Sequence, residues 1–162
     1  MHAFDNDGID VDANRSYNPE WLSNTTREHY KNFAQCVSDH YSNYTVNDEP
    51  INGARVLGEA IADITGLNAA FNAYKKLSVD QTKPSPLPIR NLSPDQLFFL
   101  SFAQSWCGTY TNEHLHYQLL TNEHPPNRYR VHGPLSNSEE FAAAFNCEKN
   151  TQMNPQNKCQ VW

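Results

Sequence analysis

The 162-residue sequence has few basic residues, no long hydrophobic run and no closely spaced pair of cysteines. Its 12 Lys and Arg residues are scattered and outnumbered by 18 Asp and Glu, which gives a net charge of −6. No basic face is therefore expected to bind nucleic-acid phosphates. No apolar segment reaches the roughly 18–20 residues that a membrane-spanning helix needs. The start shows no basic and apolar segments typical of a signal peptide. We expect no nucleic-acid partner and no membrane span in this chain.

The four cysteines are too far apart to form a C-x-x-C motif, which argues against a zinc ribbon or a thioredoxin-like site. Four Asn-x-Ser/Thr sequons are compatible with an extracellular protein, because such sequons are glycosylated on the secretory route. The sequons begin at Asn14, Asn24, Asn43 and Asn91.

The composition, 38% hydrophobic and 12% aromatic, is typical of a folded chain, and the length allows one domain or two at most. We expect a single domain over residues 1–162. Apolar residues recur at three- and four-residue steps in several segments, which predicts an all-α, that is mainly α, fold with long loops. The expected helices are 18–41, 54–77, 97–110, 113–122 and 141–145. A cap residue followed by Pro and an acid, a signal for the start of a helix, occurs at 18–20 and again at 93–95. Loops are expected at 44–52 and 79–91, with a short strand at 129–132. The helix at 97–110 is almost wholly apolar and is expected to be buried on most sides.

Two carboxylates, Glu59 and Asp63, are four residues apart in the helix expected at 54–77 and therefore share one face. Their neighbours are apolar, so both lose hydration and repel each other unless a cation or hydrogen-bond donors compensate them. A metal ion with a histidine ligand is one way to compensate them. The alternative is that both carboxylates lie at the edge of the buried stripe and point to water.

Two further groups of polar residues are candidates for chemistry. His2 and Asp5 are three residues apart, a spacing that is also common for ordinary surface pairs. His124 and Arg130 belong to a donor-rich segment that can bind an oxyanion or a carboxylate, or simply be a solvated loop. The remaining histidines form no zinc-binding pair on one helix and are expected at the surface: His29, His40, His114, His116 and His132.

Five segments in this order resemble the C-terminal part of the neprilysin and endothelin-converting-enzyme family of zinc metallopeptidases. They are HAFD (2–5), NGARVLGEAIAD (52–63), LSPDQLFFLSFAQSWCGTY (92–110), FAAAFNC (141–147) and MNPQNKCQVW (153–162). The resemblance runs from the second residue to the last. It implies the C-terminal helical portion of a gluzincin-type peptidase domain, a zinc ion as cofactor and peptides as substrates.

The same resemblance implies a role for individual residues. His2 resembles the second histidine of the H-E-x-x-H zinc motif, and Glu59 resembles the third zinc ligand. Asp5 and Asp63 resemble carboxylates that orient zinc-ligating histidines, Asp63 with an additional catalytic role as a proton donor. In such a site zinc lowers the pKa of its bound water.

On the same grounds, His124 would stabilise the oxyanion and Arg130 would bind the substrate backbone. The first zinc histidine and the general-base glutamate are expected upstream of His2. We therefore expect the chain to start inside the H-E-x-x-H motif and to be inactive without the N-terminal part of the same enzyme.

The resemblance also implies that Cys36 and Cys159 form a disulfide, whereas the partners of Cys107 and Cys147 lie in the N-terminal part. The whole protein would be extracellular or at the cell surface. An alternative function is a non-catalytic peptide-binding or decoy domain derived from that family.

Overall fold

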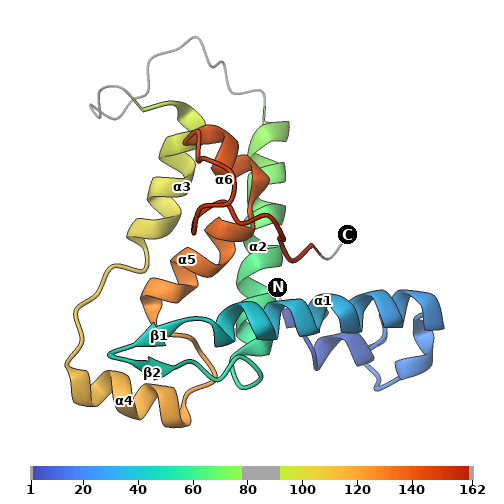
Figure 1. The fold of residues 1–162 in the computed structure, drawn as a ribbon. Helices are drawn as coiled ribbons and strands as arrows, with labels where there is room; N and C mark the ends of the chain where they lie inside the picture. Colours follow the sequence, from blue (N-terminus) through green and yellow to red (C-terminus); the bar gives the residue numbers. More distant parts are fainter. Residues whose placement is uncertain (1, 78–91, 161–162) are drawn as a thin grey trace.

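The computed structural model describes residues 2–77 and 92–160, and this part of the chain is mainly helical (Figure 1). The loop expected at 79–91, which includes the sequon residue Asn91, lies outside the described residues. The six α-helices of the described part are α1 (Asn24–Ser42), α2 (Leu57–Lys76), α3 (Pro94–Gln104), α4 (Asn112–Thr121), α5 (Asn127–Asn137) and α6 (Glu139–Ala144). The mainly α class expected from the sequence is confirmed.

Short elements complete the described part. Strands β1 (Thr45–Val46) and β2 (Glu49–Pro50) pair antiparallel. Three 3-10 helices lie before α1, at His2–Phe4, Gly8–Asp10 and Pro19–Trp21. No helix of the described residues combines the length and the apolar character required to cross a membrane.

Helix α2 is the central element, and α1, α5 and the first 3-10 helix pack against it (Figure 1). Its apolar residues meet two hydrophobic clusters, because they cover more than one face of the helix. The first cluster joins α2 to α1, α5 and the hairpin, and includes Tyr41 and Ile61. The second joins the C-terminal half of α2 to α3, α5 and α6, and includes Phe71 and Phe99. These contacts fix α5 beside the N-terminal half of α2, where Glu59 and Asp63 lie.

Two helix boundaries differ from the expected ones by more than three residues. The cap-Pro-acid signal at 18–20 marks the start of the short 3-10 helix Pro19–Trp21 and not the start of α1. Helix α1 begins after Ser23, whose side chain accepts a hydrogen bond from the backbone N–H of Thr26. Helix α3 begins at the cap-Pro-acid signal of residues 93–95, where Ser93 and Gln96 form a capping box. It ends at Gln104 rather than at residue 110.

The strand expected at 129–132 is wrong, because these residues belong to α5. Tyr129 and Gly133, four residues apart, share the helix face that meets Tyr41 of α1. The Tyr41 hydroxyl donates to the carbonyl of Tyr129, and an added Cβ at Gly133 would lie 2.1 Å from that hydroxyl oxygen. Tertiary packing therefore selects the helix here over local strand propensity.

The segment expected as a loop at 44–52 contains the β1–β2 hairpin. Its two turn residues, Asn47 and Asp48, have φ of 51° and 66°. Asn and Asp tolerate this left-handed conformation, and two such residues in a row match the twist of a tight hairpin.

The expectation that the apolar helix α3 is buried on most sides is also wrong. Phe99 is its one buried residue, and Leu100 is 42% exposed. Helix α6 and the C-terminal half of α2 cover one face of α3.

Candidate metallopeptidase site

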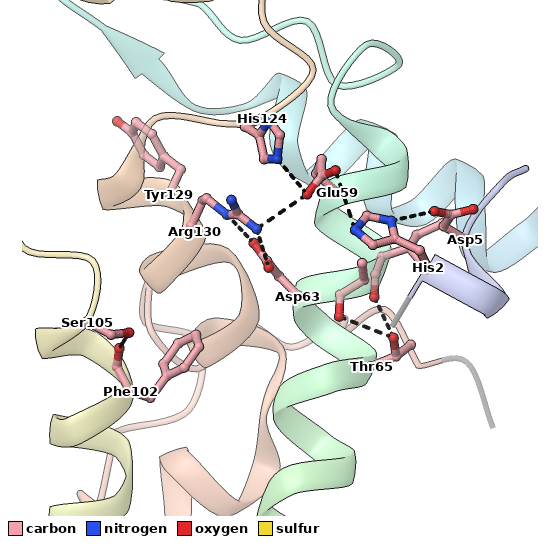
Figure 2. A network of polar contacts seen from close by, with 12 residues as sticks. His2, Asp5, Glu59, Asp63, Thr65, Phe102, Ser105, His124, Tyr129 and Arg130 are labelled. Atoms are coloured by element: carbon pink, nitrogen blue, oxygen red, sulfur yellow. Dashed lines mark hydrogen bonds and ion pairs between the residues drawn. The ribbon is translucent and has the colours of Figure 1, made fainter. Parts of the chain in front are cut away.

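The first turns of α2 carry the two carboxylates singled out by the sequence. The side chains of Glu59 and Asp63 are 15% and 10% exposed. Both lie on the side of α2 that faces α5 (Figure 2). They do not simply point into water, because each has a charged partner from another segment of the chain.

Arg130 of α5 binds both carboxylates. Its Nε and Nη2 donate to the two oxygens of Asp63 at 2.8 and 2.7 Å, and Nη2 also lies 3.4 Å from Glu59 Oε2 (Figure 2). The guanidinium stacks on the ring of Trp106, with Cζ 4.0 Å from the ring centroid. Burial alone would lower the pKa of Arg130, but the hydrogen bonds and charge of Asp63, with the charge of Glu59, raise it. One cation thus compensates a pair of carboxylates in a largely buried place.

His2 is held between Asp5 and Glu59. Its Nδ1 is 2.7 Å from Asp5 Oδ2, and its Nε2 is 3.5 Å from Glu59 Oε1 (Figure 2). Asp5 is 7% exposed, and its other oxygen accepts the backbone N–H groups of Asp7 and Gly8. Asp5 is therefore fixed by the local turn, and it orients the His2 ring so that Nε2 faces Glu59.

His124 approaches Glu59 from the segment between α4 and α5. Its Nε2 is 3.1 Å from Glu59 Oε2. The side-chain oxygen of Asn122 accepts from the backbone N–H of His124, at 2.9 Å, and lies 3.0 Å from its Nδ1. Asn122 therefore holds the His124 ring through Nδ1, and Nε2 is the ring nitrogen that faces Glu59. The structure thus brings His2, His124 and Arg130 together around one carboxylate.

The residues present fit one half of a zinc site. Two ligand atoms at about 2.0–2.1 Å from a tetrahedral zinc ion lie about 3.3 Å apart. His2 Nε2 and Glu59 Oε1 are separated by 3.5 Å, and the Asp5–His2 hydrogen bond leaves Nε2 as the ligating atom. Within residues 2–77 and 92–160 no group of three or more potential ligands is arranged to hold a metal ion. The spacing of His2 and Glu59 therefore fits two ligands of a zinc site and not a complete one.

Two site residues were missed from the sequence. Asn122 has a local signal, since an Asn side chain commonly accepts a hydrogen bond from the backbone N–H two residues later, here that of His124. Trp106 has none, because its contact with Arg130 joins residues that are far apart in the chain.

The expectation that all five remaining histidines lie at the surface is wrong for two of them. His40 is partly buried, and its Nε2 lies 3.1 Å from Ser136 Oγ and 2.9 Å from the Tyr44 hydroxyl. His132 is also partly buried, and its Nδ1 has no hydrogen-bond partner among the described residues. Burial lowers the pKa of both rings, and the charge of Arg128 adds to the effect at His132.

The cysteines divide into two kinds. Cys36 in α1 forms a disulfide with Cys159 in the C-terminal tail, 123 residues later. Cys107 and Cys147 are free thiols, the first exposed and the second partly buried. The sequon residues Asn14, Asn24 and Asn43 are exposed.

A helix that presents a glutamate to a carboxylate-oriented histidine, on a mainly helical scaffold, is an arrangement typical of zinc metallopeptidases. The family model described as Peptidase family M13 matches residues 1–161, and the chain belongs to this family. The family resemblance read from the sequence is thereby confirmed.

The chain is similar to several curated proteins along 99% of its length. It is 47% identical over 161 residues to an endothelin-converting enzyme homolog of Locusta migratoria, and 45% identical over 163 residues to neprilysin-2 of Caenorhabditis elegans. It spans 22% of each of these two relatives.

Solved structures share the fold. The zinc metalloprotease Zmp1 of Mycobacterium tuberculosis, in complex with an inhibitor, superposes with a TM-score of 0.88 at 26% identity, over 99% of this chain and 25% of that one. A Haemonchus galactose-containing glycoprotein complex gives a TM-score of 0.84 at 33% identity, over 99% of this chain and 27% of that one.

Proposed function

We propose that this chain forms the C-terminal part of a zinc-dependent metalloendopeptidase, in which His2 and Glu59 are two of the zinc ligands. The observation that carries the proposal is the 3.5 Å separation of His2 Nε2 and Glu59 Oε1, with Asp5 on the opposite nitrogen of the ring. Zinc, when bound, supplies a water of lowered pKa and polarises the peptide carbonyl.

The neighbouring residues have separate tasks in this proposal. Asp5 keeps the proton of His2 on Nδ1. His124, half-exposed beside Glu59, is placed to donate to the oxyanion that forms from the peptide carbonyl. Arg130 holds Asp63 and Glu59 in place and, where its guanidinium is accessible, binds the substrate backbone. Asp63 is paired with Arg130, and we propose that it orients a zinc-ligating histidine supplied from elsewhere and takes part in proton transfer.

We further propose that the remaining zinc ligand and the general-base glutamate come from another part of a longer enzyme, so that these 162 residues alone do not hydrolyse peptides. Two observations support this proposal. The described residues hold no three-ligand cluster, and the chain spans about a fifth of its curated relatives. Cys107, a free thiol, lines a cavity of about 750 Å³ between β1 and α5, where a further segment can pack.

The Cys36–Cys159 disulfide and the exposed sequons support an extracellular or cell-surface location for that enzyme, because disulfides persist in oxidising compartments.

The proposal is tested by titrating the 162-residue chain with Zn²⁺ in a calorimeter. We expect weak binding, since only two ligands are present, and its loss in His2→Ala and in Glu59→Gln. His29→Ala, which removes an exposed histidine of α1, is the matched control and should bind as the parent does. Binding that survives both site substitutions would overturn the ligand assignment.

A parallel assay measures peptide hydrolysis by the same chain. Chelator-sensitive cleavage would contradict the proposed need for another segment. Zinc-independent peptide binding by a soluble monomer would instead support the non-catalytic alternative.

A further inference from the structure

Helix α4 is attached to the rest of the chain largely by polar contacts. It has no fully buried residue. At its N-terminal end, the Asn47 side chain donates to Asn112 Oδ1 at 3.1 Å, and farther along, His116 Nδ1 lies 2.6 Å from Glu49 Oε2. Both contacts are exposed and join α4 to the β1–β2 hairpin. Neither of them fixes the C-terminal end of α4, from which the chain continues to His124.

That end is bound by Arg55. The Arg55 Nη1 donates to the carbonyl of Leu119, at 2.9 Å, and to the carbonyl of Leu120. The last carbonyls of a helix have no partner within the helix and lie at the negative end of its dipole, so a guanidinium is a suitable cap. The Leu119 side chain is partly buried against the first hydrophobic cluster, which brings the carbonyls within reach of Arg55.

Arg55 itself is fixed at the start of α2. Its backbone N–H donates to the Asn52 side chain, in the turn that immediately precedes the helix. Glu59 lies four residues later, in the first turn of α2. Arg55 and Glu59 therefore move as one body with α2, and they contact the two ends of one short segment, residues 119–124.

The segment is continuous in its contacts. After Leu120, the Asn122 side-chain oxygen accepts a hydrogen bond from the backbone N–H of His124 and also contacts the His124 ring. The Nε2 atom of that ring lies 3.1 Å from Glu59 Oε2. Arg55 thus holds the first residues of the segment at the C-terminal end of α4, and Glu59 contacts the His124 imidazole at the other end of the segment.

We propose that Arg55 is a positioning residue for His124, and that it acts by capping the C-terminal end of α4. The inference rests on the proposed function for the role of His124 in oxyanion stabilisation. The capping itself is a property of this chain and is testable without catalysis. Loss of the guanidinium frees the C-terminal end of α4 and lets the His124 ring leave Glu59.

The first test is NMR spectroscopy of the 162-residue chain. In the parent we expect nuclear Overhauser contacts between the His124 ring and the Glu59 side chain. Arg55→Met, which keeps the apolar stem and removes the donors, should lose them, and Arg55→Lys should keep them because a lysine still donates to the carbonyls. Arg15→Met, at an exposed loop arginine, is the control. Unchanged His124 contacts in Arg55→Met, or in Arg55→Gln if the first variant does not fold, would overturn the proposal.

The second test uses the complete peptidase that contains this segment. We expect Arg55→Met to lower kcat by roughly tenfold with KM unchanged, because a displaced oxyanion donor acts on the transition state. Arg55→Lys should recover most of the rate, and Arg15→Met should behave as the parent. A rise in KM alone would contradict the positioning role. If the parent hydrolyses no peptide, the proposed function fails, whereas the NMR result still decides the role of Arg55.

Discussion

Arg130 and Asp63 form a two-point ion pair, with Nε and Nη2 of the arginine at 2.8 and 2.7 Å from the two carboxylate oxygens. The pair joins α5 to α2 through side chains that are 14% and 10% exposed. Such planar, doubly hydrogen-bonded pairs are directional as well as strong. This pair therefore fixes the rotation of α5 relative to α2, and with it the position of the guanidinium beside Glu59.

Replacing Arg130 should destabilise the fold considerably. Arg130→Met leaves Asp63 largely buried and unpaired, and we expect the free energy of unfolding in urea to fall by about 2–4 kcal/mol. Lys75→Met is the matched control, because Lys75 pairs with Asp95 at the surface, with side chains 40% and 29% exposed. That pair should contribute less than about 1 kcal/mol. Equal losses in the two variants would contradict the assigned importance of the buried pair.

Stability should fall as the solution becomes acidic below about pH 6.5, through His40 and His132. Burial lowers the pKa of both rings in the folded chain below their usual 6.5. As the pH falls through 6.5, the unfolded chain takes up protons that the folded chain does not, so the unfolded state gains stability.

The measurement is urea unfolding between pH 5.5 and 7.5. His40→Gln should flatten the pH dependence, whereas His29→Gln, at an exposed position, should leave it unchanged. An identical slope in His40→Gln and the parent would disprove the contribution of His40.

Removal of the Cys36–Cys159 disulfide should destabilise the chain strongly. The bond closes a loop with a sequence separation of 123 residues. The chain-entropy model gives about 4–5 kcal/mol for a loop of this length. We expect the double variant Cys36→Ser, Cys159→Ser to unfold at a much lower urea concentration than the parent.

Cys107→Ser is the control for that experiment, since Cys107 is a free and exposed thiol. The parent under reducing conditions should behave as the double variant does. A double variant as stable as the parent would contradict the prediction.

Gly133→Ala should test the close packing of α1 against α5. An added Cβ would lie 2.1 Å from the Tyr41 hydroxyl oxygen and 2.4 Å from its Cζ, and Tyr41 is fully buried. Neither helix can relieve this overlap without moving, so we expect a loss of about 3 kcal/mol in thermal or urea unfolding. At Gly108 the nearest atoms belong to the partly exposed Tyr110 side chain, which can move aside. Gly108→Ala should therefore cost much less, and a similar loss at both positions would contradict the packing argument.

Local sequence patterns predicted the elements whose structure is determined by neighbouring residues. The apolar period of 54–77 predicted α2, and the Ser93–Pro94–Asp95 signal predicted the start of α3, because caps and helix periods act within one or two turns. The same reasoning failed at 129–132, where residues with strand propensity are held in α5 by contacts with α1.

The candidate site shows the same division. The sequence by itself determined that Glu59 and Asp63 share a face of α2, that His2 and Asp5 are within reach of each other, and that the family motifs are present in order. Only the tertiary structure decided that Arg130 and His124 reach that face, and that Trp106 and Arg55 support them. The spacing of 67 residues between Asp63 and Arg130 carries no local signal. Such a contact exists only because the packing of α5 on α2 brings the two charges together. A short stretch of sequence contains no information on that packing, because the residues that form it are far apart in the chain.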